Sequence, residues 1–171
     1  MSTQEDVLTM SRDWIASAQV EGIRKTAIHC YEDIPFYHRS FDEAGFDPYA
    51  IRDLDDLRRA PFVTKQDLRD NYRYGMVGVP RGDVKEIHMS SGTTGVATVA
   101  AYTEADLRAW AECFSRAFRF AGLGADDVCQ ICYGYGLFTG GLGAHYGSLR
   151  SGATVIPISA GNTERQIRVL R

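Results

Sequence analysis

The chain has 171 residues, of which 44% are hydrophobic and 24% are charged, and its formal net charge is −3. This composition excludes a disordered chain, which would combine few apolar residues with a high net charge. It also excludes a small disulfide-stapled protein, because only four cysteines are spread over the length. The isoelectric point, near 5.8, indicates no broad basic surface, so we predict no nucleic-acid partner.

The first residues do not form an export signal. Glu5 and Asp6 stand where a secretory signal carries basic residues, and no apolar core follows. The uncharged stretch 128–149 is long enough to span a bilayer, but its six glycines give it too little apolar density. We therefore predict a cytoplasmic protein without a membrane partner. Cys129 and Cys132 are interpreted as reduced thiols, since a strand would place their side chains on opposite faces.

The first part of the chain predicts helices. Residues 11–38 form a helical pattern that is interrupted at Pro35. Thr64 followed by Asp67 is a capping-box signature, which predicts another helix start. Both segments are charged and poor in glycine, as surface helices are. We predict a mainly helical region over residues 1–75.

Strand candidates alternate with helices over residues 76–171. Residues 84–89 and 98–102 are strand candidates, and Thr103 with Asp106 predicts the start of the next helix. Gly122 and Gly124 end that helix. Its apolar residues recur at the spacing of one buried face: Leu107, Trp110, Ala111, Phe114, Phe118 and Ala121.

The remaining segments complete an α/β pattern. Residues 127–133 and 154–158 predict strands, 134–143 a glycine-rich turn and 144–150 a short helix. The alternation predicts a layered sheet with flanking helices. Thr163 with Gln166 is a capping-box signature for a last helix that is too short to be stable without packing partners. We therefore expect 76–171 to be part of a larger domain, and exposed apolar surface there would favour a homodimer.

A block of hydroxyl residues and glycines directly follows the first strand candidate. Its glycines let backbone amides turn toward an anion and its hydroxyls add donors, which suits a polyphosphate. A polar hairpin loop is the alternative. No Gly-Lys-Ser/Thr ending follows, so the block is not the P-loop of kinases and GTPases. It comprises Ser90, Ser91, Gly92, Thr93, Thr94 and Gly95.

A second block, residues 133–143, alternates aromatic residues with glycines. It does not fit G-x-G-x-x-G, and no acidic ribose contact follows, which argues against a dinucleotide cofactor. Aromatic residues among glycines can form an apolar pocket for a flat ligand, and aromatic residues that only pack on the sheet are the alternative. His145 follows the block as a conceivable general base, although a structural role is the simpler interpretation. His29, His38 and His88 are isolated and show no metal-ligand spacing.

Several segments, in order, resemble the phenylacetate–coenzyme A ligases of the adenylate-forming superfamily. They are IHMSSGTTG, VAAYTEADLRAW, YGYGLFTGGLGAHYG and ATVIPISAGNTERQ, and the upstream DLRRAPFVTKQDLRDNYRYG is also similar. The glycine–aromatic block is the most family-specific of these segments. The resemblance implies that the chain is the N-terminal part of the large domain of an adenylate-forming enzyme.

The resemblance implies a two-step ligation of phenylacetate or a similar aryl acid. The carboxylate attacks the α-phosphorus of ATP to give an acyl-adenylate and pyrophosphate, and the thiol of coenzyme A then displaces AMP. The loop Ser90–Gly95 would bind the β and γ phosphates, with Mg²⁺ present. The main catalytic residues would lie beyond Arg171. The residues implied to line the aryl pocket are Tyr133, Phe138, Gly141 and Ala144.

Three departures from the family pattern bear on activity. Val96-Ala97 replaces the usual Lys-Pro, which removes a positive charge near the triphosphate. Leu149 stands near a usual glutamate, and Ala160 replaces a usual glycine. We expect this chain alone to form no acyl-adenylate. A non-catalytic module that binds a partner or an acyl ligand is the main alternative, and a ligase for a different acid is another.

Overall fold

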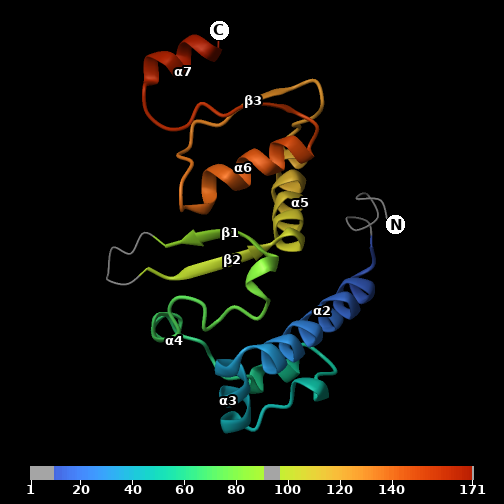
Figure 1. Ribbon diagram of the computed structural model, residues 1–171. Helices are drawn as coiled ribbons and strands as arrows, with labels where there is room; N and C mark the ends of the chain where they lie inside the picture. The colour runs from blue at the N-terminus through green and yellow to red at the C-terminus, as the bar shows by residue number, and fades with distance from the viewer. Residues whose placement is uncertain (1–9, 91–96, 171) are drawn as a thin grey trace. The chain divides into compact units, whose positions relative to one another are not determined.

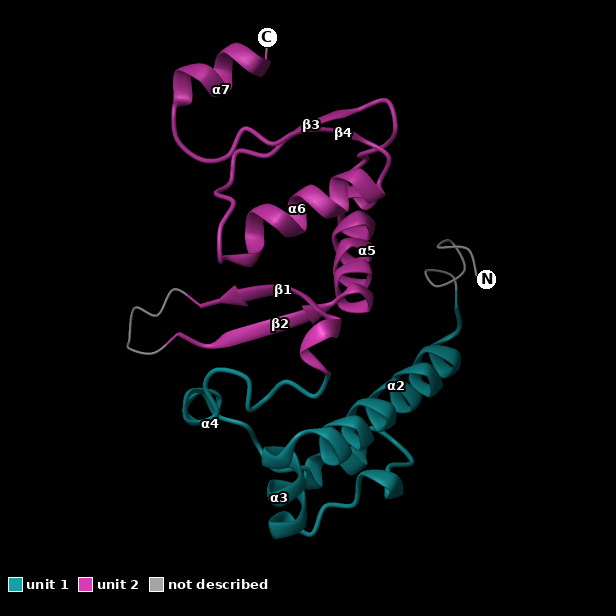
Figure 2. Ribbon diagram, viewed as in Figure 1, with its two compact units in different colours: residues 1–79 teal, residues 80–171 magenta. Residues whose placement is uncertain are grey.

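The computed structural model describes residues 10–90 and 97–170 of the chain. Its elements are shown in Figure 1. They divide into two compact units, Met1–Val79 and Pro80–Arg171 (Figure 2). The sequence-based division into functional parts, 1–75 and 76–171, stays a prediction.

The first unit is helical. Helix α2 spans Arg12–Asp33, and α3 spans Pro35–Ala44. Ile34 between them has extended backbone angles, as expected for a residue that precedes proline. The short helices η1 (Pro48–Ala50), η2 (Asp55–Arg59) and α4 (Lys65–Asp70) follow. The predicted capping box at Thr64 and Asp67 is confirmed, but the helix that it starts is short.

A small aromatic core holds the first unit together. Phe41, Phe46 and Ile51 are buried, and the rings of Phe41 and Phe46 meet edge to face with centroids 4.9 Å apart. Gly45 lets the chain turn between the two phenylalanines, because its φ of 62° lies in the left-handed region. Val20 and Ile23 of α2 pack against this core, so the helix pair and the following loop bury one common face.

The second unit contains two strand pairs. After η3 (Arg81–Asp83), strands β1 (Val84–Met89) and β2 (Val99–Thr103) pair antiparallel. Strands β3 (Val128–Gln130) and β4 (Thr154–Ile156) pair parallel and are connected through α6 (Thr139–Arg150). Within the described ranges these are two separate two-stranded sheets. The predicted bounds of β1 are confirmed, β2 is shifted by one residue, and β3 and β4 are shorter than predicted.

Helices α5 (Glu104–Phe120) and α6 pack against each other (Figure 1). Small residues allow this close contact, since a Cβ at Gly143 or Gly147 of α6 would meet Phe114 of α5. The capping box of Thr103 and Asp106 is confirmed. Ser115 is fully buried, and its hydroxyl lies 3.1 Å from that of Ser151. The predicted apolar face of α5 is half-buried except for Ala121, which is exposed because it lies beyond the last helical turn.

Two boundaries in the second unit differ from the prediction. Helix α6 begins at Thr139, so the last five residues of the predicted turn 134–143 are helical. Their glycines are needed for close packing rather than for a loop. Helix α7 (Thr163–Leu170) is capped by Asn162, whose side chain accepts from the Arg165 amide at 3.1 Å. The predicted capping box of Thr163 and Gln166 is therefore wrong, because Asn162 is the better-placed acceptor.

Candidate active site

The hydroxyl–glycine block is carried by the β1–β2 hairpin. The Ser90 amide donates to the Thr98 carbonyl at 3.0 Å, and the Thr98 amide donates to the Ser90 hydroxyl oxygen at 2.9 Å. These two bonds close the hairpin at the base of the predicted phosphate loop. The other five predicted phosphate contacts, Ser91, Gly92, Thr93, Thr94 and Gly95, lie outside the described residues. Their role in binding phosphate stays a prediction.

The glycine–aromatic segment, residues 133–138, runs beside the end of β1. The amide of Met89 donates to the Leu137 carbonyl at 3.0 Å. Met89 is the last residue of β1 and directly precedes Ser90. This hydrogen bond therefore places the glycine–aromatic segment next to the start of the hydroxyl–glycine block, although the two motifs lie almost fifty residues apart in the chain.

Two glycines of α6 let this segment lie close to the helix. A Cβ atom at Gly141 would lie 2.5 Å from the Gly134 carbonyl oxygen, and one at Gly140 would lie 2.7 Å from the Tyr133 ring. Both distances are well inside van der Waals contact. These positions consequently exclude side chains, and the segment is seated on the first turn of α6.

The predicted aryl-pocket residues have different environments. Tyr133 and Phe138 remain 54% and 51% exposed, Gly141 is buried, and Ala144 is half-buried within α6. Tyr133 covers Gly140, while Phe138 is the residue that precedes the first turn of α6. The structure thus brings Tyr133 and Gly141 to one place and puts Phe138 and Ala144 on the same helical element. Their contact with an acid stays a prediction.

Contrary to the sequence-based interpretation, His88 is not isolated. It is only 3% exposed, and its Nδ1 lies 3.2 Å from the Leu137 carbonyl oxygen while its Nε2 lies 3.1 Å from Glu86 Oε2. The rings of Tyr102 and Trp110 meet it edge to face. The signal in the sequence was the two-residue spacing of Glu86 and His88, which puts both on one face of a strand.

His145 contacts the same segment from α6. Its Nδ1 lies 3.1 Å from the Tyr135 hydroxyl, and its ring meets Tyr135 and Tyr146 edge to face. Burial raises the pKa of Tyr135, which keeps the phenol protonated and able to donate to the imidazole. These contacts support the structural interpretation of His145 over the general-base interpretation.

Comparison with known proteins shows which enzymes the chain resembles. No protein-family model matches the chain. The chain is 49% identical, over 98% of its length, to phenylacetate-coenzyme A ligase of Escherichia coli (strain K12). It is 46% identical, also over 98% of its length, to the enzyme of the same name from Aromatoleum evansii. Over almost its whole length, the chain is similar to phenylacetate–coenzyme A ligases. It spans 38% of the length of each of these two relatives.

Solved structures agree with this assignment. A crystal structure of 2-hydroxyisobutyryl-CoA ligase in complex with 2-HIB-AMP and CoA superposes with a TM-score of 0.85 at 30% identity. The same ligase in the postadenylation state gives a TM-score of 0.84 at 29% identity. Each match covers 95% of this chain and 35% of the ligase chain. The predicted α/β fold, as part of an adenylate-forming ligase, is confirmed.

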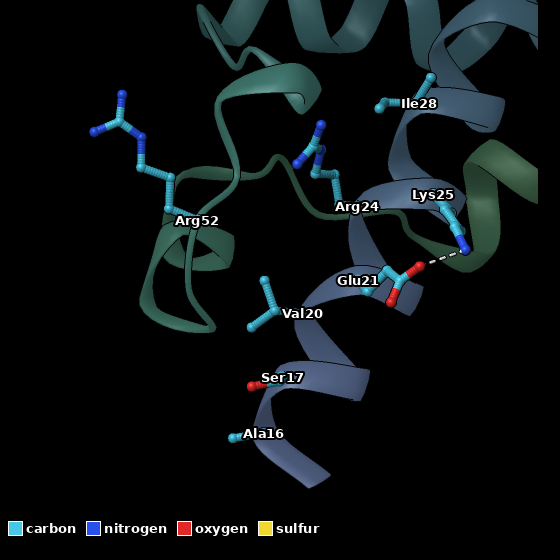
Figure 3. A pocket seen from close by; sticks show the side chains of 8 residues that line it. All are labelled: Ala16, Ser17, Val20, Glu21, Arg24, Lys25, Ile28 and Arg52. Carbon is cyan, nitrogen blue, oxygen red and sulfur yellow. Dashed lines mark hydrogen bonds and ion pairs between the residues drawn. The ribbon is translucent and has the colours of Figure 1, made fainter. Parts of the chain in front are cut away.

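Two of the cavities in the described part of the chain are of interest, and both lie away from the predicted contacts. One, of about 670 Å³, is an open groove in the first unit along α2, where Arg24 and Arg52 flank the apolar side chains of Val20 and Ile28 (Figure 3). The other, of about 360 Å³, lies in the second unit, and Tyr146 and Leu149 are among its lining residues. Leu149, which replaces the usual family glutamate, therefore contributes an apolar wall to this second cavity.

The described residues contain no group of three His, Cys, Asp or Glu side chains that could hold a metal ion. No helix in the described ranges is both long and apolar enough to cross a membrane.

Tyr146 gives this part of the site a measurable pH dependence. Burial, and then the hydrogen bond that its hydroxyl donates to Glu86, raise the pKa of Tyr146 to about 12. The unfolded value is about 10, so the folded state binds the phenol proton more tightly. The resulting stabilisation is complete below about pH 10 and is lost as the pH rises toward 12.

We expect Tyr146→Phe to remove this contribution. In urea unfolding at a series of pH values, the free energy of unfolding of the unmodified chain should fall more steeply between pH 10 and pH 12 than that of the variant. In a titration followed by tyrosinate absorbance, the variant should also lack one tyrosine that ionises at high pH. Parallel pH profiles for the two proteins would contradict the assignment.

Proposed function

We propose that this chain forms the part of a phenylacetate–coenzyme A ligase that binds the phosphates of ATP and the aryl acid. The observation that carries the proposal is the 3.0 Å hydrogen bond from the Met89 amide to the Leu137 carbonyl. This bond holds the glycine–aromatic segment beside the strand that leads into the hydroxyl–glycine loop. Adenylation needs such proximity, because the carboxylate and the α-phosphorus must approach within about 3–3.5 Å.

The proposed reaction has two steps. A carboxylate oxygen of the acid attacks the α-phosphorus of ATP, the bond to the β-phosphate oxygen breaks, and pyrophosphate leaves. The thiol of coenzyme A then loses its proton and attacks the acyl carbon, so that AMP leaves and a thioester forms. In the first step the chain's own role is to hold the triphosphate with the amides and hydroxyls of Ser90–Gly95 and to orient the acid with Tyr133 and Phe138. Such catalysis depends mainly on positioning and on donors directed at phosphate oxygens.

The acid that we propose is phenylacetate or a close aryl analogue. The curated relatives are named for phenylacetate and are 45–49% identical, whereas the 2-hydroxyisobutyryl-CoA ligase is 28–30% identical. The exposed aromatic side chains of Tyr133 and Phe138 provide flat apolar contacts for a phenyl ring. Mg²⁺ is proposed to enter with ATP, bound to its phosphate oxygens. A cytoplasmic location and a homodimer are also proposed.

A second candidate function is a non-catalytic module that binds an acyl ligand. Val96 and Leu149 favour it, because Val96 stands in place of the usual lysine and Leu149 stands near the usual glutamate. Ala97 is part of the same departure, since Val96-Ala97 replaces Lys-Pro. Without the lysine, the triphosphate loses one charge-assisted contact. The two candidates differ in whether the chain supports acyl-adenylate formation when the rest of a ligase is present.

A chimera distinguishes the two candidates. This chain would replace the matching 38% of the E. coli phenylacetate-CoA ligase, with which it shares 49% identity. We expect phenylacetate-dependent exchange of labelled pyrophosphate into ATP by the chimera and none by the 171-residue chain alone. Acid-free and 2-hydroxyisobutyrate reactions serve as controls for the identity of the acid.

Each outcome has a distinct meaning. A folded chimera that binds phenylacetate but exchanges no pyrophosphate would support the non-catalytic module. Faster exchange with 2-hydroxyisobutyrate than with phenylacetate would overturn the proposed acid while retaining the ligase. Robust exchange by the chain alone would overturn the expectation that it is insufficient for adenylation.

A further inference from the structure

We propose that His88 is a positioning residue that fixes the aryl-pocket segment, residues 133–138, to the strand that carries the phosphate loop. This inference rests on the proposed function for its catalytic meaning, although the contact itself can be tested without it. It assigns a role to a histidine that shows no catalytic or metal-binding pattern in the sequence.

The chemistry of the two atoms fixes the direction of the hydrogen bond between His88 and Leu137. The Leu137 carbonyl, 3.2 Å from Nδ1, can only accept, so Nδ1 must donate. Glu86 Oε2 lies 3.1 Å from Nε2, and a carboxylate also accepts. Both ring nitrogens of His88 therefore have a hydrogen-bond partner, the Leu137 carbonyl on one side and the Glu86 carboxyl group on the other. The Tyr146 hydroxyl donates to the other oxygen of Glu86 and so orients that carboxylate.

Packing leaves the imidazole little freedom. The Tyr102 and Trp110 rings meet His88 edge to face, with centroid distances of 5.3 and 5.5 Å. Only 3% of the residue is exposed. The position of the buried ring therefore fixes the position of the Leu137 carbonyl to which it is hydrogen-bonded. Buried polar groups keep such partners because they cannot exchange them for water.

The position of the Leu137 carbonyl affects Phe138, which is proposed to contact the acid. Leu137 directly precedes Phe138, which lies at the start of α6. Its carbonyl accepts both from the Met89 amide and from His88. Two donors from β1 thus fix the peptide that joins the aromatic segment to α6. A small displacement of this peptide would reorient Phe138, and misplacement by about 1 Å can lower a rate a hundredfold.

Two substitutions test the hydrogen bonds of the two ring nitrogens separately. The amide nitrogen of Asn occupies approximately the place of Nδ1, so His88→Asn can still donate to Leu137 but loses Glu86. The longer Gln reaches the place of Nε2, so His88→Gln retains Glu86 and loses Leu137. Both variants remove the ring and its aromatic contacts, so a merely structural role predicts similar effects for the two.

The first measurement uses the 171-residue chain and requires no ligase activity. Hydrogen–deuterium exchange of the amides of residues 134–138 should be at least tenfold faster in His88→Gln than in His88→Asn. Equal exchange rates in the two variants, with the fold retained by circular dichroism, would overturn the proposed contact. If neither variant folds, Glu86→Gln provides the second test. Its side-chain amide can still form a hydrogen bond with Nε2 while Nδ1 donates to the Leu137 carbonyl, so protection of 134–138 should persist, and loss of protection would overturn the proposal.

The second measurement uses the ligase chimera. We expect His88→Gln to raise the KM for phenylacetate at least tenfold over His88→Asn, with a change of less than threefold in the KM for ATP. Equal KM values for phenylacetate, despite different exchange rates, would overturn the positioning role. An unmodified chimera without activity would contradict the proposed function, whereas the exchange measurement would still decide the His88–Leu137 contact.

Discussion

Gly147→Ala should destabilise the second unit by about 2 kcal/mol or more, because it places a methyl group inside the packed crossing of α5 and α6. A Cβ at Gly147 would overlap the Phe114 Cβ and would lie 3.1 Å from the Phe114 carbonyl carbon. The nearest atoms belong to or adjoin the main chain, so no change of the Phe114 rotamer relieves the overlap. The helix-propensity gain of alanine over glycine, about 1 kcal/mol, offsets only part of the cost.

Thermal or urea unfolding, followed by tryptophan fluorescence, measures this effect. Trp110 lies on α5 next to Gly143, so a Trp14→Phe background leaves one reporter in the second unit. A net loss of 2 kcal/mol should lower the midpoint temperature by about 8–16 °C for a unit of this size. Gly82→Ala is the matched control, since its Cβ would meet no atom within 4 Å. Equal midpoints for the two variants would show that α5 and α6 are not in this close contact.

Gly141→Ala should weaken acid binding while leaving most of the fold intact. Its Cβ would lie 2.5 Å from the Gly134 carbonyl oxygen and 3.0 Å from the Gly134 carbonyl carbon. Alanine is favoured within a helix, so α6 is expected to persist and the segment 133–138 to move away instead. In the chimera we expect the KM for phenylacetate to rise at least tenfold, because Tyr133 and Phe138 shift with the segment.

The KM for ATP distinguishes a local change from a general one. It should change less than threefold in Gly141→Ala, because the nearest atoms to a Cβ at Gly141 belong to Gly134 and Tyr133. Gly124→Ala serves as the control, since its Cβ would have only one neighbour, Asp127 Oδ2, at 3.9 Å. Faster hydrogen exchange of residues 134–138 in the 171-residue chain would report the movement directly. An unchanged KM for phenylacetate would remove this segment from the proposed acid pocket.

The elements with strong local signals were predictable from the sequence. Thr103 and Asp106 start α5 as expected, since a capping box depends only on residues three positions apart. Pro35 separates two helices for an equally local reason. The start of α6 could not be predicted, because glycine is a poor helix former and suggests a loop. The glycines are instead required by close packing. Gly140 and Gly141 contact the segment before the helix, and Gly143 contacts α5.

The candidate site divides in the same way. The composition of the two motifs, hydroxyls with glycines and aromatics with glycines, indicated a phosphate loop and a flat-ligand pocket from local chemistry alone. Their adjacency depends on the Met89–Leu137 hydrogen bond, and the role of His88 depends on Leu137, which is 49 residues away. No local pattern encodes such pairings.

The sequence by itself therefore determined the capping boxes of α4 and α5 and the two motifs, all of which depend on residue identity and short spacing. Only the tertiary structure decided that β1 holds the glycine–aromatic segment and that glycines in α6 serve as packing surfaces. The physical reason is that a hydrogen bond or a steric limit between distant residues exists only once the chain has folded and brought them together.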